Sequence, residues 1–191
     1  MKRLLTFLKS ETGTLSVETV IVFPLLLWAF AATFLFWDMY HAQATSQRAA
    51  YTVADALSRE TDPINAAYVE GIDDVHTYLT QGQHATRLRV TALIWDDVDE
   101  EFKVSWSHTP DGDWVEHTTE TLNLREAQIP LMAKGDCALL VESQIRYIPF
   151  MNVGIQPMVM ENFVITRPRF GPQVVWEDSA GDITNCVGST T

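Results

Sequence analysis

Glu18 is a carboxylate at the start of an uninterrupted apolar run. From Thr19 to Trp37 the sequence carries no formal charge over 19 residues, which corresponds to about 28 Å of α-helix at 1.5 Å per residue. That length is close to the roughly 30 Å hydrocarbon core of a bilayer. An ionisable residue at the edge of hydrocarbon usually has a partner or a function. We therefore interpret residues 19–37 as a membrane span and Glu18 as a candidate functional residue, the alternative being a carboxylate solvated at headgroup depth.

The remaining reactive side chains form no pattern typical of an enzyme or a metal site. The histidines are scattered, and neither H-E-x-x-H nor Cys-x-x-Cys occurs. His108 and His117 flank a predicted turn and could face each other, but two histidines alone make a poor metal site. The acids at 96–101 and 111–113 lack the spacing of a calcium-binding EF-hand loop, which favours solvated loops. We expect a protein that is not an enzyme and that binds no cofactor or metal.

Bulk composition sets further limits on the function. The chain of 191 residues has a formal net charge of −12, so nucleic acid is not expected as a partner, because phosphate binding needs a basic face. About 130 residues follow the apolar segment and its helical continuation, enough for a modest core. Cys137 and Cys186 both follow the span. If that part is extracytoplasmic, they can form a disulfide; the alternative is two buried thiols.

Charge around the span indicates its orientation. Residues 1–13 include Lys2, Arg3 and Lys9, whereas no basic residue follows the span until Arg48. The positive-inside rule therefore predicts a cytoplasmic N-terminus, with the rest of the chain across the membrane. Residues 42–44, Ala-Gln-Ala, resemble a signal-peptidase site, but the apolar run is longer than the apolar h-region of a usual signal peptide. We expect the segment to be retained as an anchor.

Hydrophobic periodicity predicts the elements after the span. The Ala-rich stretch to about residue 60 favours a helical stalk, and Asp62-Pro63 ends it. A second helix is expected at 64–79, broken or weakened at Gly71. Alternating or β-branched patterns predict strands at 87–94, 102–106, 137–147 and 163–167. We expect 114–121 to be a short strand or a loop, 123–133 to be helical around Pro130, and 171–191 to be loop or tail.

Small and apolar residues recur on one predicted face of the stalk, at three- and four-residue spacing: Ala42, Ala49, Val53, Ala56 and Leu57. Such a face allows close approach of another helix or of the protein's own sheet. The sequence does not choose between the two. The fold class expected is α+β, with a long N-terminal membrane-plus-stalk helix followed by a small extracytoplasmic domain containing a mostly antiparallel sheet.

The membrane segment has a more specific motif. Gly13 is followed by four residues and then Glu18, and six residues later by Pro24 and Leu25-Leu26-Leu27. This arrangement resembles the processing signature of type IV prepilins and, more narrowly, the TadE/TadF-like pseudopilins of the tight-adherence (Tad) pilus system. The resemblance covers roughly residues 10–60. Thr19 stands where the family often has an aromatic residue, which argues against the small major pilin of that system.

The resemblance implies roles for these residues. A prepilin peptidase would cleave after Gly13, so that Thr14 becomes the new N-terminus. Its α-amino group would lie beside Glu18 of a neighbouring subunit, while Pro24 lies in the first turns of the helix, where a bend costs least. The implied partners are other pilin and pseudopilin subunits, the peptidase, an inner-membrane assembly platform and membrane lipid.

The sequence therefore predicts a minor pilin or pseudopilin, single-pass in the inner membrane, with its C-terminal domain periplasmic or extracellular. We expect a cleaved basic leader at 1–13, the membrane helix and stalk at 14–60, an α+β domain at 61–170 and a tail at 171–191. The alternative function is a periplasmic or surface binding module held by an unprocessed signal anchor.

Overall fold

The structure is a computed structural model that describes residues 14–82, 84–110, 112, 114–151 and 153–186. These residues fall into two compact units. The first holds the chain up to Tyr40 together with Pro149–Gln156, and the second holds His41–Ile148 and the chain from Pro157 onward. The helices and strands run in the order α2 (Thr14–Ser58), α3 (Ala66–Leu79), β1 (Ala85–Asp96), β2 (Glu101–His108), α4 (Thr119–Asn123), the 3₁₀ helix η2 (Glu126–Gln128), β3 (Cys137–Tyr147), β4 (Met158–Thr166), β5 (Trp176–Glu177) and β6 (Ile183–Thr184).

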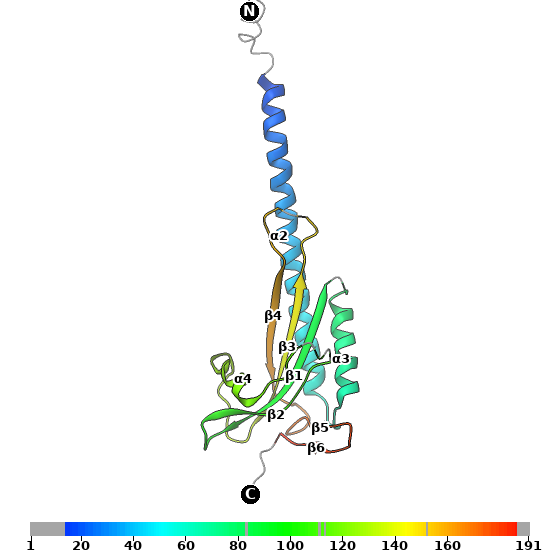
Figure 1. The fold of residues 1–191 in the computed structure, drawn as a ribbon, viewed down its shortest axis with the longest axis vertical. Helices are drawn as coiled ribbons and strands as arrows, with labels where there is room; N and C mark the ends of the chain where they lie inside the picture. Colours follow the sequence, from blue (N-terminus) through cyan, green and yellow to red (C-terminus); the bar gives the residue numbers. More distant parts are fainter. Residues whose placement is uncertain (1–13, 83, 111, 113, 152, 187–191) are drawn as a thin grey trace, which may run out of the picture. The chain divides into compact units, whose positions relative to one another are not determined.

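The long helix α2 runs without a break through Pro24 and ends at Ser58. Pro24 lies inside the helix and removes one backbone hydrogen-bond donor, a loss that helices in membranes tolerate through local adjustments of the neighbouring turns. The expected α+β class is confirmed: this apolar helix precedes a small domain built on an antiparallel sheet (Figure 1).

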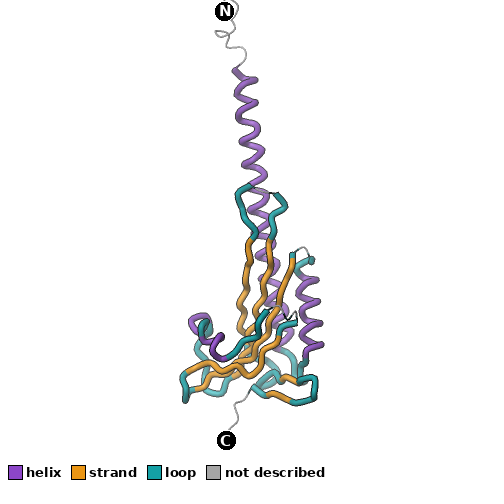
Figure 2. Tube along the Cα trace, viewed as in Figure 1, coloured by secondary structure: helices purple, strands orange, loops and turns teal. Residues whose placement is uncertain are grey.

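The main sheet has the strand order β2-β1-β3-β4, and every neighbouring pair is antiparallel. The strands β1 and β2 form one hairpin and β3 and β4 form another, with β1 and β3 paired at the centre. Residues of β1 and β3 are buried on both faces of the sheet, because each face is covered by other parts of the chain (Figure 2). The two faces therefore differ in what they bury.

One face of the sheet packs against the stalk part of α2, between His41 and Ser58. Ala50, Val53 and Leu57 join a buried cluster with strand residues such as Val90 and Val141. Asn162 of β4 also donates hydrogen bonds to Ser46 of α2 at 2.8 Å and to Ser143 of β3 at 3.0 Å. The small-residue face of the stalk therefore packs on the protein's own sheet, which decides between the two alternatives left open by the sequence.

Two segments differ from the sequence-based expectation. Helix α3 continues through Gly71, because burial of Val69, Ile72 and His76 offsets the cost of about 1 kcal/mol for glycine in a helix. The expected helix at 123–133 is instead α4 with η2, whereas residues 114–118 form a loop, one of the two alternatives expected there. The helix starts earlier because Thr118 and Thr121 form a capping box.

The last strand and the tail also differ. Strand β4 begins at Met158, five residues before the expected start, because it pairs with β3 along its whole length. The segment expected to be loop contains the short antiparallel pair β5 and β6. A disulfide joins Cys137 at the start of β3 to Cys186, and both sulfurs belong to buried residues of the same apolar cluster as the stalk.

Candidate functional site

The first unit exposes an apolar helix surface on every side. Val20, Ile21, Val22 and Phe23 are successive residues that together circle the helix, and they are 72%, 67%, 42% and 60% exposed. The same holds through Leu25–Trp28 and at Phe30. A helix that is apolar all round belongs either in a core or in a membrane, and here no core covers it. By length and composition, α2 could span a membrane.

Glu18 lies in the first turns of this apolar helix and is exposed. No ion pair joins Glu18 to another described residue. Thr14 is the first residue of α2, four positions before Glu18. Gly13 lies outside the described residues, so the predicted scissile bond has no structural description. Glu18 is thus a carboxylate without a cation from its own chain, within the part that the structure describes.

Three aromatic side chains gather near the other end of the apolar segment. The ring of Phe34 lies 6.0 Å from the ring of Trp37, one turn further along α2. It also lies 6.0 Å from the ring of Phe150, in an edge-to-face arrangement. Aromatic residues are enriched where a membrane protein crosses the interface between hydrocarbon and water. The group therefore fits the C-terminal end of a membrane span.

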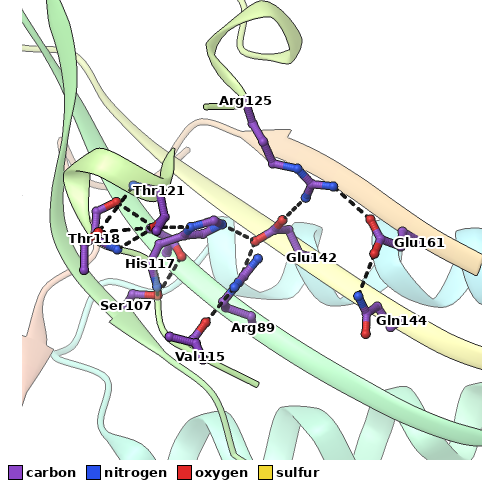
Figure 3. Close-up of polar contacts among 11 residues, drawn as sticks. Arg89, Ser107, Val115, His117, Thr118, Thr121, Arg125, Glu142, Gln144 and Glu161 are labelled. Carbon is purple, nitrogen blue, oxygen red and sulfur yellow. Dashed lines mark hydrogen bonds and ion pairs between the residues drawn. The ribbon is translucent and has the colours of Figure 1, made fainter. Parts of the chain in front are cut away.

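The second unit holds a buried charge cluster that the sequence analysis did not predict (Figure 3). Glu142 of β3 is 1% exposed, yet its carboxylate has three partners. Arg89 donates from Nε to Oε2 at 2.7 Å, and His117 places Nε2 2.8 Å from the same oxygen. Arg125 donates from Nη1 to Oε1. We refer to Glu142, Arg89, His117 and Arg125 as the Glu142 cluster.

The cluster is positioned by the sheet register and by helix α4. Arg89 and Glu142 are direct cross-strand partners in the β1–β3 ladder, so their side chains leave the same face of the sheet about 5 Å apart. His117 precedes the capping box of α4, and its Nδ1 lies 3.1 Å from Thr121 Oγ1. Arg89 also donates to the carbonyl of Val115 at 2.6 Å. The cluster therefore fastens the segment before α4 to the sheet.

The electrostatics favour an ionised carboxylate at this position. Burial by itself raises the pKa of Glu142, but the hydrogen bonds from His117 and Arg89 and the charge of Arg89 outweigh it and lower that pKa to about 2. A buried charge without such partners would cost several kcal/mol. At neutral pH the cluster thus contains a carboxylate that is fully compensated by cations and donors.

The order carboxylate, imidazole, hydroxyl in Glu142, His117 and Thr121 resembles a hydrolase relay. The hydroxyl, however, also lies 3.0 Å from the carbonyl oxygen of Thr118 and accepts from the Thr118 amide at 2.9 Å. The carboxylate is shared with two arginines. The Thr121 hydroxyl is held in the capping box, and the Glu142 carboxylate beside it is already paired. The arrangement is therefore better suited to supporting the fold than to catalysis.

The structure does not bring the other sequence candidates together. His108 Nδ1 lies 3.4 Å from Glu116 and its ring packs on Trp176, whereas His117 belongs to the Glu142 cluster. In the acidic turn after β1, Asp96 and Asp99 both accept hydrogen bonds from Lys103. Over the described ranges, no group of three or more His, Cys, Asp or Glu side chains is placed to hold a metal ion.

A signal for the Glu142 cluster was present in the sequence. Glu142 directly follows the five apolar residues Cys137–Val141 of its strand, and Arg89 stands within a run that becomes buried on both faces. A charge at such a position requires a partner. The identity of that partner depends on which strands pair and in what register, and those are not readable from a single strand.

Comparison with protein-family models finds a match over part of the chain. The model of the family described as TadE-like protein matches residues 13–55, which confirms the resemblance over the membrane helix and most of the stalk. No curated protein and no solved structure matches the chain. The matched segment indicates a protein associated with the Tad pilus system, and its apolar helix is consistent with a single-pass membrane protein.

Proposed function

We propose that this protein is a pseudopilin, or minor pilin, of a Tad-type pilus assembly and secretion machine. One observation carries the proposal: the family match begins at Gly13, where a helix follows that is apolar on all sides and whose Glu18, in its first turns, has no ion-pair partner among the described residues. An ordinary membrane anchor needs the apolar helix but has no need of that carboxylate.

The unpaired carboxylate gives a physical reason for assembly. A charge at the centre of a bilayer costs about 2.5–3.5 kcal/mol on insertion scales. Cleavage after Gly13 would create a positive α-amino group on Thr14, and this amine could neutralise Glu18 of a neighbouring subunit. Two charges that are each costly in hydrocarbon would then stabilise one another only when two helices are correctly aligned.

The second unit serves as the extracytoplasmic domain in this proposal. Its disulfide between Cys137 and Cys186 is typical of proteins outside the cytoplasm. The Glu142 cluster, a buried polar group in this unit, is engaged in holding the fold. We therefore propose a structural subunit without enzymatic activity, whose partners are other pilin-like subunits, the prepilin peptidase and the inner-membrane assembly platform.

The test of this proposal is the pair of variants Glu18→Ala and Glu120→Ala, expressed with the rest of the pilus system. Glu120 is an exposed acid at the start of α4, so it controls for the loss of one negative charge. We expect both variants to reach the membrane, but only Glu18→Ala to be depleted from isolated pili or assembly complexes. Normal incorporation of Glu18→Ala would contradict the role assigned to Glu18.

Processing is tested separately at the scissile bond. Gly13→Leu should block cleavage, because a bulky residue replaces the small one at that position, whereas Gly13→Ala should be cleaved in part. The readout is the mass of the protein recovered from membranes that contain the peptidase. Full cleavage of Gly13→Leu would count against a prepilin peptidase substrate.

A further inference from the structure

The connection between β3 and β4 is unusually apolar for an exposed loop. From Tyr147 to Met160 the sequence has no charged residue, and Pro149–Gln156 reads Pro-Phe-Met-Asn-Val-Gly-Ile-Gln. Phe150 is 59% exposed and Met151 is 39% exposed. Loops between strands are usually polar and rich in turn residues, and grouped exposed apolar side chains mark an interaction surface.

This connection belongs to the same compact unit as the membrane part of α2. Phe150 packs edge-to-face on Phe34 with 6.0 Å between the ring centroids, and Figure 1 shows the connection lying against α2. Leu35 of α2 is fully buried, although Phe34 and Phe36 on either side of it are 49% and 48% exposed. One face of α2 is therefore covered at this level, while the neighbouring apolar side chains remain open.

The position of Phe34 along α2 fixes the depth of the connection. Phe34 precedes Trp37 by three residues, which is about 4.5 Å along the helix axis. Trp37 is the last residue of the uncharged run and Asp38 follows it, so the hydrocarbon boundary falls near Trp37 if α2 spans the membrane. Phe150 touches Phe34 and thus lies at the edge of the hydrocarbon, where exposed apolar and aromatic side chains are stable.

We propose that the described residues of the β3–β4 connection, 149–151 and 153–156, insert into the membrane leaflet that α2 leaves at Trp37, and that lipid surrounds them there. The connection is then a second membrane contact of this chain, separate in sequence from the span by more than a hundred residues. Lipid is favoured because the exposed surface of Phe150 and Met151 continues the exposed apolar surface of α2, which itself faces lipid. The inference rests on α2 being a membrane span and does not depend on processing or pilus assembly.

Exposed Arg146 fits this placement. It precedes Phe150 by four residues, so the two lie at most about 14 Å apart along the chain. A cation this close to an inserted apolar segment can lie among lipid phosphates, in the headgroup layer that flanks the hydrocarbon.

The experiment uses the full chain in phosphatidylcholine vesicles at low protein density, with an environment-sensitive NBD label on one introduced cysteine. The described residues include no free cysteine, so Phe150→Cys and Met151→Cys supply the labelling site. Leu26→Cys, in the middle of α2, is the control for membrane depth. Leu131→Cys, at an apolar residue that is 93% exposed in the second unit, is the control for water.

We expect labels at 150 and 151 to emit at shorter wavelength than the label at 131 and to be quenched by doxyl lipids, as the label at 26 is. Water-like emission at both positions, with quenching retained at 26, overturns the inference and leaves the span intact. A label at 150 that is shielded only at high protein density, and that doxyl lipids do not quench, also overturns it, because the occupant is then a second copy of the chain. Absence of quenching at 26 would show that α2 does not span the membrane, which would overturn the inference as well.

Discussion

Glu18 and Glu142 are both carboxylates placed among apolar residues, but they differ in the ion-pair partners that surround them. Glu142 is 1% exposed and is met by two arginines and a histidine. Glu18 is exposed on an apolar helix and pairs with no other described residue. The first carboxylate is satisfied within the fold, whereas the second has no cation among the described residues and, in our proposal, is paired by a neighbouring subunit.

This difference suits Glu142 to a structural role and Glu18 to a role in recognition. A buried charge with a complete set of partners contributes to one folded arrangement. Removing one partner leaves a buried charge uncompensated, which destabilises the fold. A charge at the membrane edge without a partner contributes nothing to the fold of its own chain. It is available for recognition, which is the role that we propose for Glu18.

The largest expected effect comes from Glu142→Ala. The substitution leaves Arg89, which is 7% exposed, as a buried unpaired cation, and breaking a buried pair in this way costs about 3–5 kcal/mol. Denaturant unfolding of the full chain in detergent, followed by tryptophan fluorescence, measures the loss. The matched control is Glu161→Ala, because Glu161 is a half-exposed partner of Arg125, where loss of an ion pair costs about 0.2–1 kcal/mol. Equal losses for the two variants would contradict the distinction between a buried and a surface carboxylate.

Acid should weaken the same cluster. The folded-state pKa of Glu142 is about 2, against an ordinary value near 4.5. The unfolded chain therefore binds a proton first as the pH falls, so this stabilisation is present above about pH 4.5 and is lost progressively toward pH 2. The loss is on the order of 3 kcal/mol. In Glu142→Gln this part of the acid dependence should disappear. A wild-type unfolding free energy that is flat from pH 4.5 to 2 would show that Glu142 is not held ionised.

His76 is a second buried titratable group in the second unit and can be compared with Glu142. It is fully buried on α3, and neither of its ring nitrogens has a partner among the described residues. Burial lowers its pKa to about 4, so the unfolded chain takes up the proton first and stability falls as the pH drops from about 6.5 to 4, by on the order of 3 kcal/mol. His76→Leu should flatten the unfolding free energy in this range. An unchanged slope in the variant would mean that His76 does not titrate as a buried imidazole.

The smallest effect on stability is expected for Glu18→Gln. The side chain has no partner in the described part of the chain, so the free energy of unfolding of the second unit should change by less than about 0.5 kcal/mol. Assembly should nevertheless fall, because the amide cannot neutralise an α-amino group. A loss of domain stability comparable to that of Glu142→Ala would place Glu18 in the fold and remove the contrast.

The features that could be predicted from the sequence are those carried by local pattern. The uncharged run from Thr19 to Trp37 predicts the membrane helix, and alternation predicts the central strands, because both signals need only neighbouring residues. The continuity of α3 through Gly71 depends instead on tertiary burial that offsets a poor propensity. The Glu142 cluster depends on the pairing of residues 53 positions apart, which no local pattern contains.

The packing of the stalk is another feature that local sequence pattern could not predict. The small-residue face was visible in the sequence, but its occupant was not, because an alanine face suits a neighbouring helix and a sheet equally well. Only the structure places Val53 and Leu57 against β1 and β3.

The most direct test of the central claim is the N-terminus of the mature protein, determined by intact mass or N-terminal sequencing from native membranes. Our account predicts that the chain begins at Thr14, four residues before Glu18, with a free α-amino group. A protein that retains Met1 would contradict processing and leave a signal-anchored domain, and a chain that begins at Thr45 would contradict the membrane anchor itself.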